Sequence, residues 1–182
     1  YGHGSIVLAR ELAAMGAYGF AVATVDEGIE LRNNGIIQPI LVLGFVAKEQ
    51  YADMITHHIM PAIFTYSMAK DFDAVASSMH TVADVHIKLD TGMSRIGFQV
   101  TEQSADEIAQ IAASPNIIIE GIFTHFSKAD ETDKTFTKKQ ADTYEQMITW
   151  LKDRQIEIPI HHISNSAGIV DLPEYNKDIV RA

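Results

Sequence analysis

The feature that most constrains this chain is the repeated alternation of strand-like and helix-like segments along its 182 residues. Short apolar runs bounded by Gly, Pro, Asn or Asp predict strands, and apolar residues spaced three and four apart predict helices. The predicted strands are residues 19–24, 39–43, 60–64, 84–90, 117–124, 161–164 and 178–181. The predicted helices are residues 6–15, 26–33, 48–56, 67–80, 101–113 and 137–154.

Capping residues predict where several of these helices begin. Ser5, Asp26 and Thr101 each stand at a predicted helix start and can accept a hydrogen bond from its free N–H groups. Thr137 and Gln140 have the spacing of a capping box, in which two side chains satisfy these groups reciprocally.

The alternation predicts an α/β fold with parallel strands and crossover helices. A doubly wound sheet and a (β/α)8 barrel of the TIM type both fit this pattern. The barrel is favoured because polar residues recur at the ends of predicted strands, where barrel enzymes carry their active sites. These residues are Lys88, Asp90, His125, Asn165, Ser166 and Arg181.

Composition argues against several classes of protein. The 24 acidic and 14 basic residues give a net charge of −10, which argues against a surface for nucleic acid or acidic membrane. The absence of cysteine excludes disulfides, thiolate chemistry and Cys-ligated zinc, and it fits a reducing compartment. The longest apolar run, residues 36–47, is interrupted by polar and breaker residues and is shorter than the roughly 20 residues that span a bilayer.

The ends of the sequence predict an internal piece of a longer polypeptide. It begins at Tyr1 instead of an initiator Met, and it stops directly after the last predicted strand. We therefore expect a single domain over residues 1–182, with further segments outside it.

Residues 85–98 are the strongest candidate for part of a functional site. Apolar side chains alternate with His86, Lys88 and Asp90, so the polar groups share one face of the predicted strand. The strand then breaks at a Thr-Gly pair, and Arg95 follows on the far side of the turn. Two cations on a strand that runs into such a loop suggest the mouth of an α/β active site. A salt-bridged edge strand facing water is the alternative.

Two loops are candidate anion sites. Residues 1–5 lead into a helix N-terminus, whose free N–H groups and dipole favour a phosphate, and the hydroxyls of Tyr1 and Ser5 could add donors. Residues 164–168 place small hydroxyl and amide side chains before a glycine and could form a second phosphate cup. Ordinary turns are the alternative at both places.

Other strand ends carry single candidate residues. His125 could bind a metal, move a proton or stack on an aromatic ligand, although a hydrogen-bonded core histidine is the commoner case. Arg181 would donate to a ligand and never accept a proton, unless it pairs with Asp178 at the surface. A Ser-His-Asp triad has no Gly-x-Ser-x-Gly elbow to support it, and a metal site from His125, His161 and His162 lacks the usual spacing.

Five blocks, in order along nearly the whole chain, resemble the alanine racemase family. Tyr-Gly-His-Gly at residues 1–4 is similar to the end of the family signature, in which a lysine lies four residues before the tyrosine. Lys88-Leu-Asp-Thr-Gly-Met-Ser-Arg95 resembles the family's Lys-x-Asp-Thr-Gly-Met-x-Arg stretch. The other blocks are Thr124-His125-Phe126 with Ala129-Asp130-Glu131, His162-Ile-Ser-Asn165-Ser166-Ala and Asp178-Ile-Val-Arg181.

The resemblance implies a fold-type III enzyme that depends on pyridoxal 5'-phosphate. Its barrel would be incomplete here, lacking the first strand and the closing segment, and the family's C-terminal β domain would be absent. The implied activity is the interconversion of L-alanine and D-alanine for peptidoglycan, by a homodimer in the bacterial cytoplasm. A racemase for serine or for a broader set of amino acids stays open. So do a single-domain pyridoxal-phosphate-binding protein without racemase activity and a metal-dependent barrel hydrolase.

Racemisation needs two bases on opposite faces of the substrate Cα. In the family these are the Schiff-base lysine, which would precede Tyr1, and a tyrosine from the C-terminal domain of the partner subunit. The resemblance therefore implies that no catalytic base lies in this chain, and that this piece alone is inactive.

The resemblance also assigns cofactor contacts. Tyr1 and Ser166, with Asn165 beside them, would hold the phosphate group. Arg95 would contact the ring hydroxyl, and His125 would pack against the pyridine ring.

The remaining implied roles concern two basic groups and their neighbours. Arg181 would bond to the pyridine nitrogen, with His162 behind it. Lys88 would be the lysine often found carbamylated, an anion that holds Arg95 with charge-assisted hydrogen bonds.

Overall fold

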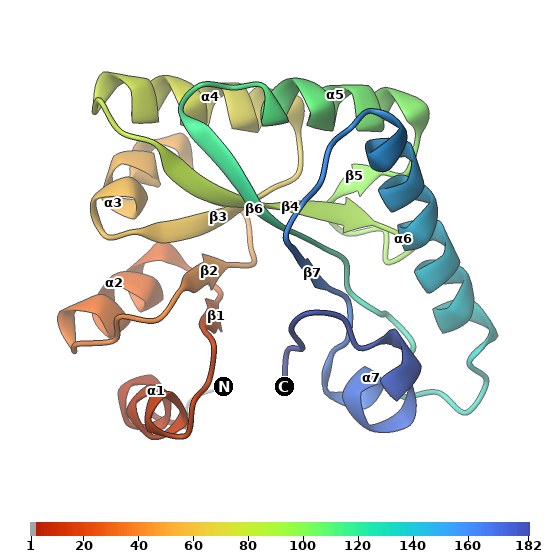
Figure 1. Cartoon of the computed structure of the whole chain (residues 1–182). Coiled ribbons are helices and arrows are strands. Elements are labelled where there is room, and N and C mark those ends of the chain that lie inside the picture. Colours follow the sequence, from red (N-terminus) through yellow and green to blue (C-terminus); the bar gives the residue numbers. More distant parts are fainter. Residues whose placement is uncertain (1–2) are drawn as a thin grey trace.

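The computed structural model describes residues 3–182, which form one curled parallel sheet covered by helices (Figure 1). The strands are β1 (Phe20–Val22), β2 (Ile40–Val42), β3 (Ile59–Ile63), β4 (Ala83–Asp90), β5 (Phe98–Gln99), β6 (Ile117–Phe123) and β7 (Ile160–His162). The helices are α1 (Ser5–Ala14), α2 (Val25–Asn33), α3 (Tyr51–Thr56), α4 (Tyr66–Ser78), α5 (Glu102–Ala112), α6 (Thr135–Asp153) and α7 (Ser166–Asp171). Short 3-10 turns occupy Lys48–Gln50 and Pro173–Tyr175.

The strand order distinguishes a barrel from a doubly wound sheet. The strands follow one another as β1-β2-β3-β4-β6-β7, every pairing is parallel, and β5 pairs only with the end of β4. A doubly wound sheet reverses its order at a switch point, and this sheet does not. The fold is therefore an incomplete (β/α)8 barrel, as the sequence predicts, with β1 and β7 as its two edges.

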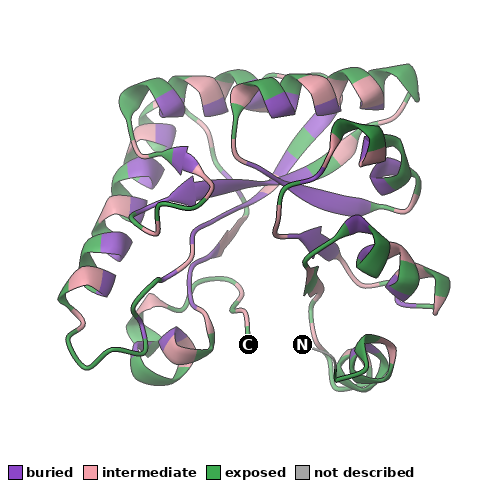
Figure 2. Cartoon of the chain, turned by 180° about the vertical axis from the view of Figure 1, so that it is seen from behind, coloured by how far each residue is buried: buried purple, intermediate pink, exposed green. Residues whose placement is uncertain are grey.

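The sheet has buried side chains on both faces, so it separates two cores. The large core lies between the strands and the helices, whose inner faces are buried and outer faces exposed (Figure 2). A small apolar cluster inside the curl consists of Leu41, Met60, Ala62 and Phe123. β4 contributes side chains to both faces of the sheet. Ile87 and Leu89 enter the outer core, whereas His86 and Lys88 are buried on the opposite face. The central position and burial of β4 contradict the alternative of a water-facing edge strand.

Helix starts follow the predictions in part. Thr101 caps α5 as predicted, by accepting a hydrogen bond from the N–H of Ser104. α2 is capped by Thr24, which forms a capping box with Glu27, so the assignment of Asp26 as cap was wrong. Thr24 takes this place because its backbone is extended, whereas Asp26 already lies in the first turn.

Two other predicted helix starts were wrong, and one short helix was not predicted. Gly4 is the N-cap of α1, and Ser5 is its first residue. α6 begins at Thr135, so Thr137 lies inside it and does not cap it; its buried hydroxyl finds no hydrogen-bond partner within residues 3–182. Residues 166–171, for which no helix was predicted, form the short helix α7.

The segment 178–181 runs beside β7 without forming a strand. The N–H of Ile179 donates to the carbonyl of His161, and the N–H of Arg181 donates to the carbonyl of Ser164. From the first bond to the second, the C-terminal segment advances two residues, whereas the segment that includes β7 advances three. A regular parallel ladder needs equal steps, which is why the predicted strand is not formed.

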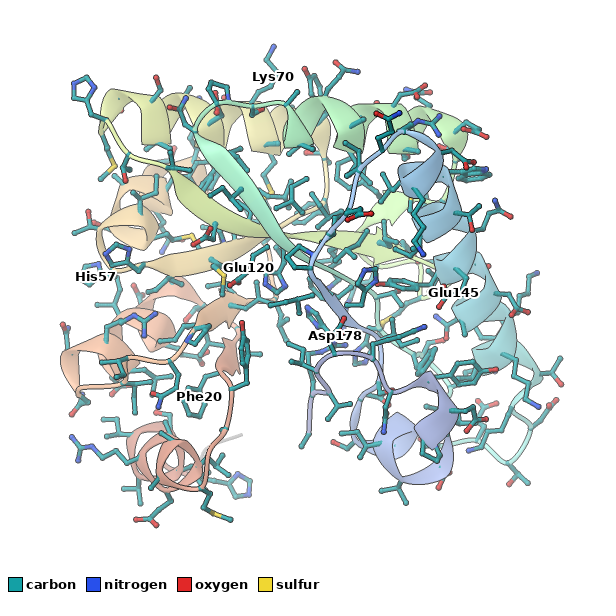
Figure 3. The ribbon with its side chains drawn as sticks, viewed as in Figure 1. Phe20, His57, Lys70, Glu120, Glu145 and Asp178 are labelled. Carbon is teal, nitrogen blue, oxygen red and sulfur yellow. The ribbon has the colours of Figure 1, made fainter. Side chains whose placement is uncertain are left out.

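Among residues 3–182, no helix combines the length and apolar character needed to cross a bilayer. Figure 3 shows how the side chains are distributed: Lys70 and His57 project outward, whereas Glu120 lies within the curl of the sheet. The inward-facing polar groups are therefore the ones that can build a site.

Candidate active site

Lys88 lies inside the curl, near the carboxyl end of β4. Its side chain is almost fully buried, its Nζ atom donates a 3.4 Å hydrogen bond to the carbonyl of Leu43, and it stands 5.5 Å from the centre of the Phe123 ring. Burial, together with the positive charges of Arg95 and Arg181, lowers the pKa of Lys88 to about 8, against an opposing effect of Asp90. Lys88 thus carries a partly neutral amine at mildly alkaline pH.

Asp90 shapes the loop between β4 and β5. Its Oδ1 atom accepts hydrogen bonds from the N–H groups of Gly92 and Ser94, both at 2.9 Å. Burial alone would raise the pKa of Asp90, but the backbone N–H groups of Ser94, Gly92 and Arg95 bring it below its usual range. The carboxylate is therefore committed to the loop backbone, and the exposed Arg95 is held at the mouth of the curl.

Arg181 is anchored to the ends of β6 and β7. One terminal nitrogen donates to His162 Nδ1 at 2.6 Å, and the other donates to the Thr124 carbonyl at 2.8 Å and approaches His125 Nδ1 at 3.4 Å. Burial lowers the pKa of Arg181 to about 10, so it stays protonated at neutral pH. The hydrogen bonds of Arg181 point into the barrel, so Arg181 does not form the alternative surface pair with Asp178.

Asp178 instead ties the C-terminal segment to the sheet. Its carboxylate accepts a 2.8 Å hydrogen bond from the N–H of His161 at the start of β7. Because Arg181 lies three residues further on, this bond helps to place the guanidinium at the strand ends.

His125 is half-buried beside Arg181 at the end of β6. Burial lowers its pKa to about 4, and the charges of Arg181, Arg95 and Lys88 act in the same direction. The ring is therefore neutral at physiological pH and presents an aromatic face in cationic surroundings, unlike a histidine satisfied within the core.

The three histidines considered as metal ligands do not converge. His162 is fully buried inside the curl, where burial and the charge of Arg181 lower its pKa to about 2. His161 projects to the other face, where its Nδ1 atom lies 2.8 Å from the Tyr144 hydroxyl of α6. This separation argues against the metal-dependent hydrolase.

The second predicted phosphate cup is a capped helix start. Asn165 accepts from the N–H of Gly168 at 3.0 Å and donates to the Phe126 carbonyl at 3.1 Å, so both ends of its side chain are engaged. Ser166 is exposed at the first position of α7. Tyr1, predicted to hold the same phosphate, lies outside the described residues.

Sequence reasoning missed several residues that assemble this region. Gln140 of α6 is buried; its carbonyl oxygen accepts from the N–H of Ser127 and its amide donates to the His125 carbonyl. Gln140 was wrongly assigned to a capping box, because it lies three residues after Thr137, which is the spacing of that motif. In the structure both residues lie inside α6. Glu120 was missed, and so was the pairing of His86 with His162, because only the paired strands bring these side chains together.

The region has the charge that an anionic, aromatic ligand requires. Besides burial, the positive charges of Arg181, Arg95 and Lys88 lower the pKa of His125, while the carboxylate of Asp90 is bonded to backbone. A cationic mouth in a chain of net charge −10 is a local feature that fits a phosphorylated pyridoxal ring. This donor set could bind and orient such a group.

An incomplete parallel α/β barrel with cationic side chains at its strand ends has the features of a barrel enzyme that binds an anionic ligand there. A family model described as Alanine racemase, N-terminal domain, matches residues 1–182. The chain belongs to the alanine racemase family, within its N-terminal barrel domain.

Individual relatives agree with this assignment. An alanine racemase of Clostridium tetani is 45% identical over 181 residues, which are 100% of this chain and 47% of that protein. The structure of alanine racemase of Clostridium difficile 630 in complex with cycloserine superposes with a TM-score of 0.99 at 42% identity, covering 100% of this chain and 50% of that chain. That of Bacillus anthracis with bound L-Ala-P gives a TM-score of 0.93 at 28% identity, covering 100% and 47%. The chain thus spans about half the length of the relatives it matches.

Proposed function

We propose that the polypeptide carrying this chain is a pyridoxal-phosphate-dependent alanine racemase that interconverts L-alanine and D-alanine. The observation that carries the proposal is the anchored Arg181, held by His162 and the Thr124 carbonyl beside the neutral ring of His125. Membership of the family over the whole chain supports the same function. We further propose a cytoplasmic bacterial homodimer that makes D-alanine for peptidoglycan.

The domain organisation is part of this proposal. Residues 1–182 would be one barrel domain. The C-terminal β domain of the partner subunit would supply the tyrosine base. The Schiff-base lysine would lie four residues before Tyr1. This chain would then supply the cofactor's binding surface and not the bases.

Each residue of the mouth has a physical task in this proposal. The cofactor, when bound, supplies an electron sink for the negative charge that develops at the substrate Cα. Arg181 donates a hydrogen bond to the pyridine nitrogen and keeps its proton, because its pKa stays at about 10. His125 packs against the ring, Arg95 meets the ring hydroxyl, and Tyr1 and Ser166, with Asn165, receive the phosphate.

Lys88 is proposed to be carbamylated. A partly neutral amine is the form that can add carbon dioxide, and the pKa of about 8 makes that form accessible. The protonated ammonium form repels Arg95 and Arg181, whereas a carbamate would attract them through charge-assisted hydrogen bonds. The modification would therefore replace repulsion by attraction at the mouth.

The test uses the full-length gene product supplied with pyridoxal phosphate. Conversion of each alanine enantiomer into the other is measured, and the protein is reduced with borohydride so that mass spectrometry locates the pyridoxyl label. The expected result is racemisation with the label on a lysine four residues before Tyr1. Racemisation of serine without alanine, or cofactor binding without racemisation, would overturn the proposal. A label on Lys88 would mean that the catalytic and structural lysines have been exchanged.

A further inference from the structure

We propose that Glu120 and His86, deep inside the barrel, are positioning residues for Arg181 and act on it through His162. This inference rests on the proposed function only for the identity of the ligand that Arg181 contacts. The chain of contacts itself is a property of the folded barrel.

Four side chains from three strands and the C-terminal segment form one continuous line of hydrogen bonds. Glu120 Oε2 lies 3.1 Å from His86 Nε2, and His86 Nδ1 lies 2.9 Å from His162 Nε2. The line ends where His162 Nδ1 lies 2.6 Å from the terminal nitrogen of Arg181. It connects the floor of the barrel with the mouth.

The proton positions along this line follow from its two ends. A guanidinium only donates, so His162 Nδ1 must accept, and the hydrogen of this ring lies on Nε2. That hydrogen points at His86 Nδ1, which must accept in turn, so the hydrogen of His86 also lies on Nε2. The Glu120 carboxylate accepts it. A single direction of donation thus runs from Arg181 through both rings to the acid.

The surroundings show that the barrel is built to hold these rings. His86 is 2% and His162 0% exposed. A register shift between β4 and β6 at Val85/His86 sets Gly121 opposite His86, and a Cβ at Gly121 would overlap the His86 ring. Phe123 stacks on the His162 ring at 4.5 Å with an interplanar angle of 8°.

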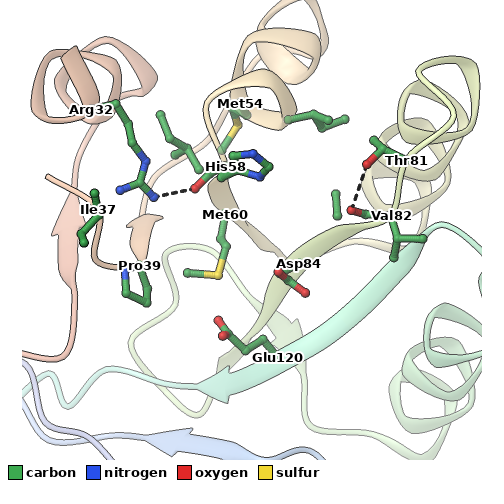
Figure 4. Close-up of a pocket in the computed structure, with 13 residues that line it drawn as sticks. Arg32, Ile37, Pro39, Met54, His58, Met60, Thr81, Val82, Asp84 and Glu120 are labelled. Carbon is green, nitrogen blue, oxygen red and sulfur yellow. Dashed lines mark hydrogen bonds between the residues drawn. The ribbon is translucent and has the colours of Figure 1, made fainter. Parts of the chain in front are cut away.

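Glu120 ends the line at a pocket on the floor of the barrel. This pocket has a volume of about 210 Å³ and is also lined by Asp84, Arg32 and His58 (Figure 4). Arg32 gives its hydrogen bonds to backbone carbonyls, among them that of His58, and not to Glu120. Glu120 is therefore the acceptor for the outer N–H of His86, and this bond holds both rings in place and, through them, the direction in which Arg181 is held.

The test compares three variants of the full-length protein. Glu120→Leu removes the terminal acceptor. Glu120→Gln keeps an acceptor oxygen and removes the charge. Asp84→Asn is the matched control, because it removes a carboxylate from the same pocket without touching the line. Circular dichroism confirms that each variant folds.

The first readout is nitrogen NMR of the histidine rings in cofactor-free protein, in which a bare ring nitrogen and a protonated one have well-separated signals. Wild type, Glu120→Gln and Asp84→Asn are expected to show bare Nδ1 and protonated Nε2 at His86 and His162. Glu120→Leu is expected to leave the Nε2 hydrogen of His86 without its acceptor, to shift the signal of that nitrogen, and to speed rotation of the Arg181 guanidinium. A protonated Nδ1 on His162 in wild type, or unchanged signals in Glu120→Leu, would overturn the inference.

The second readout is the racemase reaction. We expect kcat/KM to fall about 10-fold in Glu120→Leu, the scale on which loss of a partner behind a ligand acts at metal sites, and to recover in Glu120→Gln. Equal activity in Glu120→Leu and wild type would overturn the positioning role. A wild-type protein with the expected NMR pattern and no racemase activity would refute the proposed function alone.

Discussion

His161 and His162 are neighbours in sequence, yet they serve opposite sides of the sheet. His161 bonds to Tyr144 of α6, whereas His162 bonds to Arg181 inside the curl. The alternation of side chains along a strand produces this division. His161 therefore contributes to helix packing, and His162 contributes to the candidate site.

Replacing Lys88 by Met should remove a pH dependence of stability. Burial holds the pKa of Lys88 near 8, so between about pH 8 and about pH 10.4 the unfolded chain binds more protons than the folded one. Stability from this group therefore rises with pH across that window. We expect urea unfolding of cofactor-free protein, without bicarbonate, to show the rise in wild type and not in Lys88→Met. The exposed Lys139 provides the control, and Lys139→Met should keep the rise.

Labelled bicarbonate tests the carbamate on Lys88 directly. Carbon-13 NMR of wild type should show a carbamate signal that disappears in Lys88→Met and persists in Lys139→Met. A signal that survives the loss of Lys88 would assign the modification to another amine.

Replacing Asp90 by Asn should loosen the loop that holds Arg95. The pKa of Asp90 is lowered in the folded state, so its contribution is present above the unfolded pKa of about 4 and is lost as pH falls through the folded value. Because bonds to a charged acceptor are stronger, we expect a loss of about 1 kcal/mol at pH 7, measured by urea unfolding. The difference should shrink below about pH 4. Asp142→Asn, on the exposed face of α6, should change neither value.

Replacing Gly121 by Ala should strain the barrel interior at His86. The added Cβ would overlap the imidazole ring, and we expect a loss of about 1–3 kcal/mol in the free energy of unfolding. In the double variant with His86→Ala the ring is gone, so the two losses should not add. Strict additivity in this cycle would show that Gly121 is needed for some other reason.

Replacing Arg181 by Lys should damage the site although the charge remains. A lysine has one ammonium group and cannot reach His162 and the Thr124 carbonyl in the geometry of the guanidinium. We expect weaker binding of pyridoxal phosphate, by about 10-fold on the scale of one charge-assisted hydrogen bond, measured by titration of the cofactor-free protein. Arg154→Lys, which alters an arginine paired with Glu102 and Asp106 outside the site, is the control and should bind normally.

Local sequence patterns predicted most elements of this fold. Apolar periodicity located the six strands of the main sheet path and the longer helices, because those patterns depend only on residues a few positions apart. The polar face of β4 and the strand-end position of His125 were predictable for the same reason, whereas Arg181 reaches the strand ends from a segment that is not a strand. Helix starts were less predictable, since Thr24 and Asp26 both suit a cap and the backbone conformation decides between them.

The sequence by itself determined the α/β class, the alternation of faces and the family. Only the tertiary structure decided that the sheet has a barrel order, that Gln140 supports His125, and that Glu120 reaches Arg181 through two histidines. His86 and His162 are 76 residues apart, and His86 and Glu120 are 34 apart. Their contact depends on the register between paired strands and on the shift at Val85/His86, which local propensities do not encode.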